Sequence, residues 1–123
     1  MYLINNKEYT CSVAVTLDIF NDRWKLSIIW YLLDGDKRFK DLHEIINEIT
    51  QKTLTVKLKE LEEKNIIHRE VFAEVPPKVV YSLTEAGKKL KPVLQEMYKW
   101  GINYATEFGE ITNQNPCKIN ICE

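Results

Sequence analysis

The sequence predicts a mainly helical fold with a small β-hairpin, which places it in the α+β class. Apolar residues recur at helical spacing as far as residue 65 and again from residue 84 onward. Between these parts lie two short runs, 66–72 and 79–83, whose β-branched and aromatic residues are typical of strands. We therefore expect three helices, a short hairpin and a final long helix.

Length and composition fit one globular domain. The chain has 123 residues, of which 45% are hydrophobic and 28% charged, and these values argue against disorder. We expect a domain over 11–108, an N-terminal arm over 1–10 and a C-terminal tail over 109–123. The longest apolar run, 28–33, is much shorter than the roughly twenty residues that span a bilayer, so no membrane association is expected.

Neither a signal peptide nor a disulfide scaffold is expected. The N-terminus has no charged segment followed by a long apolar stretch. The three cysteines leave one thiol unpaired within a monomer. We therefore interpret the chain as a cytoplasmic protein with reduced thiols.

Caps and apolar faces define the elements of the first half. Residues 13–20 fit a helical period and a strand period about equally well. Residues 24–33 are apolar nearly all round, which predicts a buried central helix with Asp22 as N-cap and Gly35 as left-handed C-cap. After a short extended connector, apolar spacing predicts an amphipathic helix over 41–49.

The second half begins with a helix over 50–64, for which Thr50 is the expected N-cap. Asn65 is expected to end this helix by adopting the left-handed backbone conformation. Two prolines make the joint at 73–78 a projecting loop, because proline cannot donate a ladder hydrogen bond. Thr84 is expected to cap one last long helix, which Pro92 should kink.

Two adjacent amphipathic helices followed by a hairpin form the layout of a winged helix-turn-helix, with 50–64 as its recognition helix. Opposite the leucines of this helix lie Lys52, Thr55, Val56 and Lys59. Gln51 and Lys52 lie in the first turn, where glutamine suits adenine and lysine suits guanine. Val56 would suit a thymine methyl group, and Thr55 a base or a phosphate. The alternative is that these lysines only solvate a surface helix.

The hairpin loop is the second candidate DNA contact. Its Pro76-Pro77-Lys78 segment is stiff and ends in a cation, so this wing could lay Lys78 or Arg69 against phosphates or into a minor groove. The alternative is a simple hairpin with a polar tip.

The charge of the chain gives mixed evidence for nucleic-acid binding. The formal net charge is −1. From residue 50 to residue 91, however, nine Lys or Arg residues face six Asp or Glu residues, so this segment is locally basic. The near-neutral total leaves two alternatives open, a winged-helix module that binds protein and a protein that binds a small ligand, without DNA binding in either case.

Most of the chain, from about residue 11 to residue 101, resembles the HxlR-type winged-helix transcriptional regulators of bacteria. The most specific part is the Val-Pro-Pro-Lys-Val-x-Tyr-x-Leu-Thr run at 75–84. The other matching stretches are 24–26, 38–39, 51–55, 58–62, 69–70, 85–87 and 100–101. Position 56 is often polar in such proteins but is Val56 here, so the base preference of the family is not carried over.

The resemblance implies a homodimer that binds double-stranded DNA, with the first helix and the long C-terminal helix in the dimer interface. The exposed apolar stripe expected on the last helix supports the same prediction. Two-fold symmetry would then make the operator an inverted repeat. The candidate DNA-binding residues are Arg38, Gln51, Lys52, Thr53, Thr55, Val56, Lys59, Arg69 and Lys78.

Cys11 is the candidate redox sensor. Members of the family often carry a cysteine just before the first helix, and in some of them it senses oxidants or electrophiles. Here Ser12 follows, where many members have proline. The alternative is an inert thiol. Cys117 and Cys122 lie outside the matching stretch and are interpreted as tail sequence.

We expect no enzymatic activity, no metal and no cofactor. His43 and His68 lack metal-ligand spacing with the cysteines, and the scattered glycines form no phosphate-binding loop. Trp30 and Tyr31 are expected in the core or interface, where they could also line a small apolar pocket.

Overall fold

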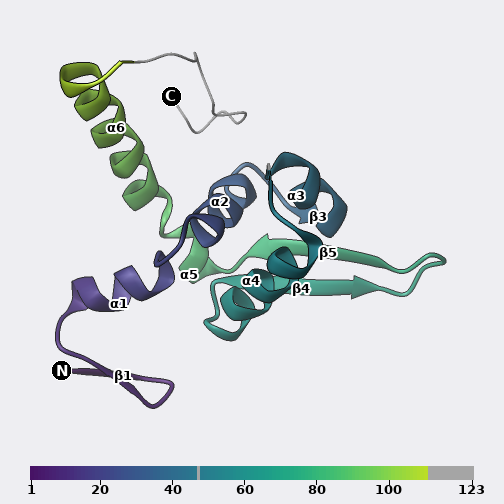
Figure 1. Cartoon of the computed structure of the whole chain (residues 1–123). Helices are drawn as coiled ribbons and strands as arrows, with labels where there is room; N and C mark the ends of the chain where they lie inside the picture. The colour runs from purple at the N-terminus through teal and green to yellow at the C-terminus, as the bar shows by residue number, and fades with distance from the viewer. Residues whose placement is uncertain (47, 111–123) are drawn as a thin grey trace.

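The computed structural model describes residues 1–46 and 48–110 and confirms the α+β class and the winged-helix layout (Figure 1). The elements in chain order are β1 (Tyr2–Ile4), β2 (Lys7–Tyr9), α1 (Ser12–Ile19), α2 (Arg23–Leu32), β3 (Lys37–Arg38), α3 (Phe39–Ile45), α4 (Gln51–Glu63), β4 (Ile67–Phe72), β5 (Lys78–Leu83), α5 (Glu85–Lys88) and α6 (Lys91–Phe108). No helix in the described part of the chain is both long and apolar enough to span a membrane.

The main sheet has three antiparallel strands in the order β3-β5-β4, one more than the expected hairpin. The additional strand, β3, comes from the predicted extended connector and pairs Lys37 with Tyr81. The hairpin of β4 and β5 projects away from the helices as the wing (Figure 1).

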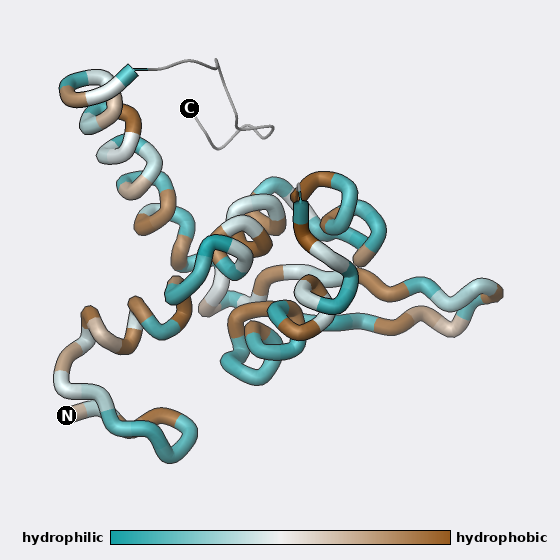
Figure 2. Tube along the Cα trace, viewed as in Figure 1, coloured by the Kyte–Doolittle hydropathy of each residue, from teal (hydrophilic) through white to brown (hydrophobic). Residues whose placement is uncertain are grey.

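The core lies where α2, α3 and α4 pack against one face of this sheet. In Figure 2, α4 alternates between apolar and hydrophilic positions, as expected for a helix with one buried face. The fully buried side chains of the core are Ile28, Ile29, Leu42, Leu54, Leu58, Leu61 and Ile67.

The predicted caps are confirmed. Asp22 accepts from the Lys25 N–H (2.9 Å), Thr50 from the Thr53 N–H (3.1 Å) and Thr84 from the Gly87 N–H (3.1 Å). Asn65 has φ +62°, the left-handed conformation that ends α4.

Two glycines near helix ends have backbone positions that disfavour a side chain. Gly35 has a positive φ of +148°, which favours glycine but lies outside the left-handed helical region expected for it. Gly87 lies so close to the end of α4 that a Cβ atom there would be 2.3 Å from the Ile66 carbonyl oxygen.

The boundaries expected for α3 were wrong. Asp41 accepts from the Arg38 N–H (3.2 Å), so the helix begins at Phe39 and Asp41 lies in its first turn. At Ile46 the backbone is extended, although Ile46 and Ile49 remain buried. The apolar spacing continued beyond the helix because Ile46 and Ile49 of the following loop also contribute to the core.

The single kinked helix expected after Thr84 was also wrong. The chain forms α5, turns at Leu90 and begins α6 at Lys91. Pro92 therefore lies in the first turn of α6, where the missing N–H needs no partner.

The expected N-terminal arm is structured. β1 and β2 form a hairpin whose two-residue turn, Asn5-Asn6, has positive φ angles of 50° and 65°. The ambiguous segment after it is a helix, α1. Tyr9 is buried and ties this N-terminal hairpin to α1.

Candidate nucleic-acid interface

The exposed face of α4 carries most of the predicted DNA-binding residues. Its opposite face is buried through Leu54, Leu58 and Leu61. Residues 52, 55, 56 and 59 share one exposed face, with Gln51 exposed in the first turn. The Thr55 hydroxyl donates to the Gln51 carbonyl oxygen (2.8 Å), which leaves the hydroxyl oxygen free to accept from a partner.

Thr53 is the exception among the predicted α4 residues. It is only half exposed and lies on the same row of the helix as Lys57 and Glu60, which faces α2. Its hydroxyl oxygen accepts from the Thr50 hydroxyl (3.0 Å). The structure therefore assigns Thr53 to the cap and does not bring it together with Lys52, Val56 and Lys59.

Two groups of lysines can be separated on α4 and its C-cap. Lys57 pairs with Asp22 (3.0 Å) and Lys64 pairs with Asp18 (3.0 Å), so both cations hold α4 to other helices. Lys52 and Lys59 form no ion pair with any residue in the described ranges 1–46 and 48–110. Their ammonium groups are therefore available to an external anion.

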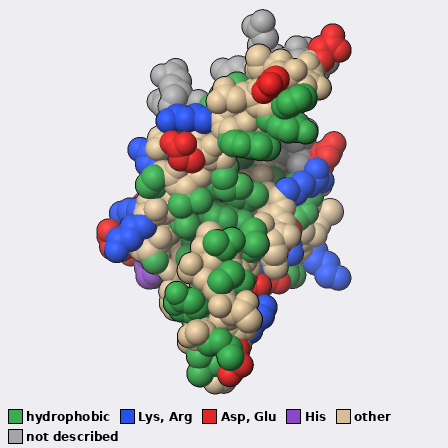
Figure 3. Space-filling view, turned by 90° about the vertical axis from the view of Figure 1, so that its left-hand side faces the viewer, with side chains coloured by type: hydrophobic (Ala, Val, Ile, Leu, Met, Phe, Trp, Pro, Cys, Tyr) green, Lys and Arg blue, Asp and Glu red, His purple; other side chains and the backbone are tan. Residues whose placement is uncertain are grey.

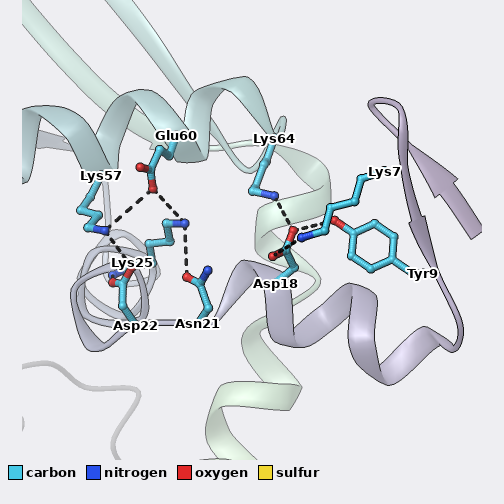
Figure 4. A network of polar contacts seen from close by, with 9 residues as sticks. All are labelled: Lys7, Tyr9, Asp18, Asn21, Asp22, Lys25, Lys57, Glu60 and Lys64. Carbon is cyan, nitrogen blue, oxygen red and sulfur yellow. Dashed lines mark hydrogen bonds and ion pairs between the residues drawn. The ribbon is translucent and has the colours of Figure 1, made fainter.

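A polar cluster between α2 and the middle of α4 holds the two helices together (Figure 4). Lys25 is only 4% exposed, and its Nζ atom lies 2.9 Å from Glu60 Oε2 and 3.3 Å from Asn21 Oδ1. Burial raises the pKa of Asp22, but the Lys25 N–H and the Lys57 ammonium outweigh it and lower the pKa overall. The same carboxylate raises the pKa of Lys57. The sequence did not indicate this cluster, because Lys25 lies in a mostly apolar run that predicts a buried helix.

A second polar cluster lies at the C-terminal end of α4, around Asp18 (Figure 4). Asp18 Oδ2 accepts from the Tyr9 hydroxyl (2.6 Å) and from Lys64 Nζ (3.0 Å), while Oδ1 accepts from Lys7 Nζ (3.2 Å). The hydrogen bond from Tyr9, followed by that from Lys64, lowers the pKa of Asp18 well below its usual range. The same bond raises the pKa of Tyr9.

The base of the wing brings a second set of cations together. Arg38, Lys40 and Lys78 line one shallow depression with Phe39 and Pro77. The Lys78 Nζ atom also lies over the Phe72 ring, 5.3 Å from its centroid. Lys40 was not among the predicted site residues; its position follows from α3 beginning earlier than expected.

Arg69 does not join this set. The register pairs Arg69 with the buried Tyr81, whereas Phe72 pairs with Lys78. Because successive side chains alternate between the faces of a strand, Arg69 and Lys78 lie on opposite faces of the wing. A single phosphate contact therefore cannot use both residues.

Cys11 is at the position expected for it. It is the N-cap residue of α1, its thiol is exposed, and its side chain makes no capping hydrogen bond. Cys117 and Cys122 lie outside the described residues.

An exposed apolar face runs along α1 and α6, on the side of the molecule away from the wing (Figure 3). On α1 it includes Leu17, which is 60% exposed. On α6, Trp100 is 66% exposed and stacks on Tyr104, which in turn contacts Phe108. The other members of this apolar face are Val13, Val93 and Met97.

A pocket opens between α2 and α6 beside this face. Its lining includes the expected Trp30 and Tyr31, and Trp30 stacks on Tyr98.

Among residues 1–46 and 48–110, no three His, Cys, Asp or Glu side chains lie close enough to hold a metal ion.

The chain matches a family model, the HxlR-like helix-turn-helix, over residues 19–108. The chain belongs to this HxlR-like family. Residues 1–18, which hold the N-terminal hairpin, Cys11 and most of α1, precede the match.

Relatives of this HxlR-like protein are named as regulators. It is 49% identical over 94 residues to the HTH-type transcriptional regulator YdeP of Bacillus subtilis (strain 168), covering 76% of this chain and 73% of YdeP. The redox regulator HypR in its oxidized form has 46% identity and a TM-score of 0.71, covering 76% of this chain and 96% of HypR. The reduced form of the transcriptional regulator YodB from B. subtilis has 42% identity and a TM-score of 0.67, covering 83% and 97%. The chain is thus a transcriptional regulator of the helix-turn-helix type.

Proposed function

We propose that this regulator is a homodimer that binds a specific double-stranded DNA sequence through α4 and the wing. One observation carries the proposal: Lys52 and Lys59 lack partners among the described residues, whereas Lys57 and Lys64 hold α4 in place. The same helix face offers Gln51 and Thr55 as hydrogen-bonding groups and Val56 as an apolar contact. Phosphate and base contacts need this combination of groups.

The wing supplies the second contact. Arg38, Lys40 and Lys78 form a cationic edge that suits the phosphate backbone beside the groove that α4 enters. Arg69, on the other face of the wing, would reach a different phosphate. Such a regulator needs no catalytic step, and access to the chromosome agrees with the expected cytoplasmic location.

The apolar face of α1 and α6 supports the homodimer. Exposed aromatic side chains along a helix are costly in water, and a second copy with the same face would cover them. Two-fold symmetry presents two copies of α4, so we expect an operator with inverted half-sites about 10 base pairs apart or a multiple of that distance.

The test is a fluorescence anisotropy titration with a duplex that the purified protein selects from a random library. We expect tight binding to the selected duplex, weaker binding to a scrambled one, and affinity that falls steeply between about 50 and 200 mM salt. Failure to select any sequence, with no salt-dependent binding, would contradict the proposal and favour a protein-binding module.

Cys11 is proposed as the thiol through which oxidants or electrophiles act. It is exposed at the N-terminus of α1, in the proposed interface, where an oxidant or electrophile can reach it. Among the similar structures, HypR is described as a redox regulator, and YodB is known in a diamide-treated form. Diamide should change the affinity of the wild type for the selected duplex and leave Cys11→Ser unaffected. An equal response of both proteins would exclude Cys11 as the sensor.

A further inference from the structure

Helix α1 has two opposite faces with different contacts. Val13 and Leu17, one turn apart, point to the exposed apolar face. Asp18 points the other way, toward the N-terminal hairpin and the C-terminal end of α4 (Figure 4). Asp18 is therefore one direct link between the proposed dimer interface on α1 and the end of α4.

Three elements meet on the Asp18 carboxylate. Tyr9 and Lys7 come from β2, and Lys64 is the C-cap residue of α4. Asp18 is mostly shielded, since only 19% of its side chain is exposed, so its bonds to Tyr9 and Lys64 are less screened than a surface ion pair. Lys7, with 61% of its side chain exposed, is the weakest of the three partners.

Two sets of ion pairs link α4 to two different helices, α2 and α1. The cluster of Lys25, Lys57, Asp22 and Glu60 ties the middle of α4 to α2, beside the buried leucines of α4. The bond between Lys64 and Asp18 fixes its far end to α1, outside the core. Because α4 stays held by its buried leucines and α1 has no buried residue, loss of the second tie would leave the domain folded while it lets α1 change its angle to α4.

We propose that Asp18 is a positioning residue that joins the N-terminal hairpin, α1 and the C-terminal end of α4 into one unit and thereby fixes the separation of the two recognition helices. The inference rests on the proposed dimeric DNA-binding function. Asp18 and the N-terminal hairpin precede residues 19–108, which match the family model.

The test is the dependence of binding on half-site spacing. The selected duplex is compared with versions whose half-sites lie one base pair closer or farther apart, which moves them by about 3.4 Å and rotates them about the DNA axis. Wild type, Asp18→Asn, Lys64→Gln and their double variant are titrated at a temperature where circular dichroism shows each to be folded. Asp34→Asn is the matched control, because the one ion pair of Asp34 among the described residues is a long one with Lys37 (3.9 Å), which lies outside α4.

We expect the wild type and Asp34→Asn to discriminate strongly against the altered spacings. Asp18→Asn and Lys64→Gln should lose about threefold or more of that discrimination, and the double variant should lose no more than either alone, because both remove the same bond. A purely structural role would lower the melting temperature and leave the spacing preference unchanged, which would overturn the inference.

A measurement without DNA separates this inference from the proposed function. Spin labels at Lys59→Cys, with the three native cysteines replaced by serine, report the distance between the two α4 helices of a dimer. Asp18→Asn should broaden the distance distribution, and an unchanged distribution would contradict the positioning role. If the wild type selects no DNA but the distance distribution still broadens in Asp18→Asn, the DNA-binding proposal fails while the link between α1 and α4 holds.

Discussion

At the scale of single residues, the partners of a lysine determine what it can contribute. Lys57 and Lys64 stabilise the position of α4, whereas Lys52 and Lys59 face outward without an ion pair among the described residues. Sequence alone could not make this distinction, because Asp22 and Asp18, the carboxylates 3.0 Å from Lys57 and Lys64, lie 35 or more positions away in the chain.

Lys59 and Gln51 should therefore differ in their effects on DNA binding. Lys59→Ala should weaken binding to selected and scrambled duplexes alike and reduce the salt slope by about one unit, because it removes a phosphate contact. Gln51→Ala should lose about 1–3 kcal/mol for the selected duplex only, as expected for a base contact. Anisotropy titrations measure both effects, with Lys99→Ala as control, since Lys99 pairs with Glu96 on α6. Equal loss of specific and non-specific binding in both variants would contradict these roles.

The charge of Asp18 should make stability depend on pH. The hydrogen bond from Tyr9 and the ammonium of Lys64 hold its pKa well below the usual range in the folded chain, whereas in the unfolded chain the carboxyl takes up a proton near pH 3.9. Below about pH 4 the unfolded state therefore binds more protons, and stability falls as the pH falls.

Urea unfolding of wild type and Asp18→Asn between pH 7 and pH 3 measures this contribution. The wild type should be the more stable protein at neutral pH, and the difference should shrink below about pH 4. Asp22 also has a lowered pKa, but it is present in both proteins and cancels in the difference. A difference that does not change with pH would show that the Asp18 charge contributes nothing to stability.

At the scale of elements, the sequence predicted most of what local chemistry determines. The caps at Asp22, Thr50 and Thr84 were correct because each depends on residues three positions apart. The errors arose where tertiary contacts decide: α3 ends at Ile45 although its apolar spacing continues, and the chain turns at Leu90 before Pro92.

For the candidate site too, the sequence predicted what depends on local periodicity and not what depends on tertiary contacts. The exposed row on α4 follows from helical periodicity and was predictable. The separation of Arg69 from Lys78, and the place of Lys40 beside the wing, depend on strand register and on the pairing of β3 with β5, which the sequence did not indicate.

Gly87 is the position where α5 leaves no room for a side chain. A Cβ atom there would approach the Ile66 carbonyl oxygen, which also accepts from the Thr84 N–H (3.0 Å). Gly87→Ala should lower the free energy of unfolding by about 2–3 kcal/mol, because backbone must shift to make room. Ala86→Gly is the control, since Ala86 is exposed and removal of its methyl should cost only about 1 kcal/mol of helix propensity. Urea denaturation compares the two, and equal losses would contradict the steric explanation.

At the scale of the whole molecule, the apolar face lies apart from the wing, so the proposed dimer interface and the proposed DNA contacts use separate surfaces (Figures 1 and 3). Trp100→Glu should convert the dimer to a monomer, because a carboxylate would be buried without a partner. Light scattering at micromolar concentration measures the mass. Lys99→Glu, at the neighbouring exposed position, should remain dimeric. A monomeric wild type would contradict the dimer itself.

The stacked aromatic side chains of α6 also have a consequence for dosage. If two copies must meet before either binds an operator tightly, occupancy at low abundance rises with roughly the square of the number of chains in the cell. Doubling expression would then raise occupancy about fourfold, whereas a monomeric binder would respond only in proportion. Under the proposed dimer, the exposed stripe from Val93 to Phe108 would make the abundance of the regulator an input to the gene that it controls.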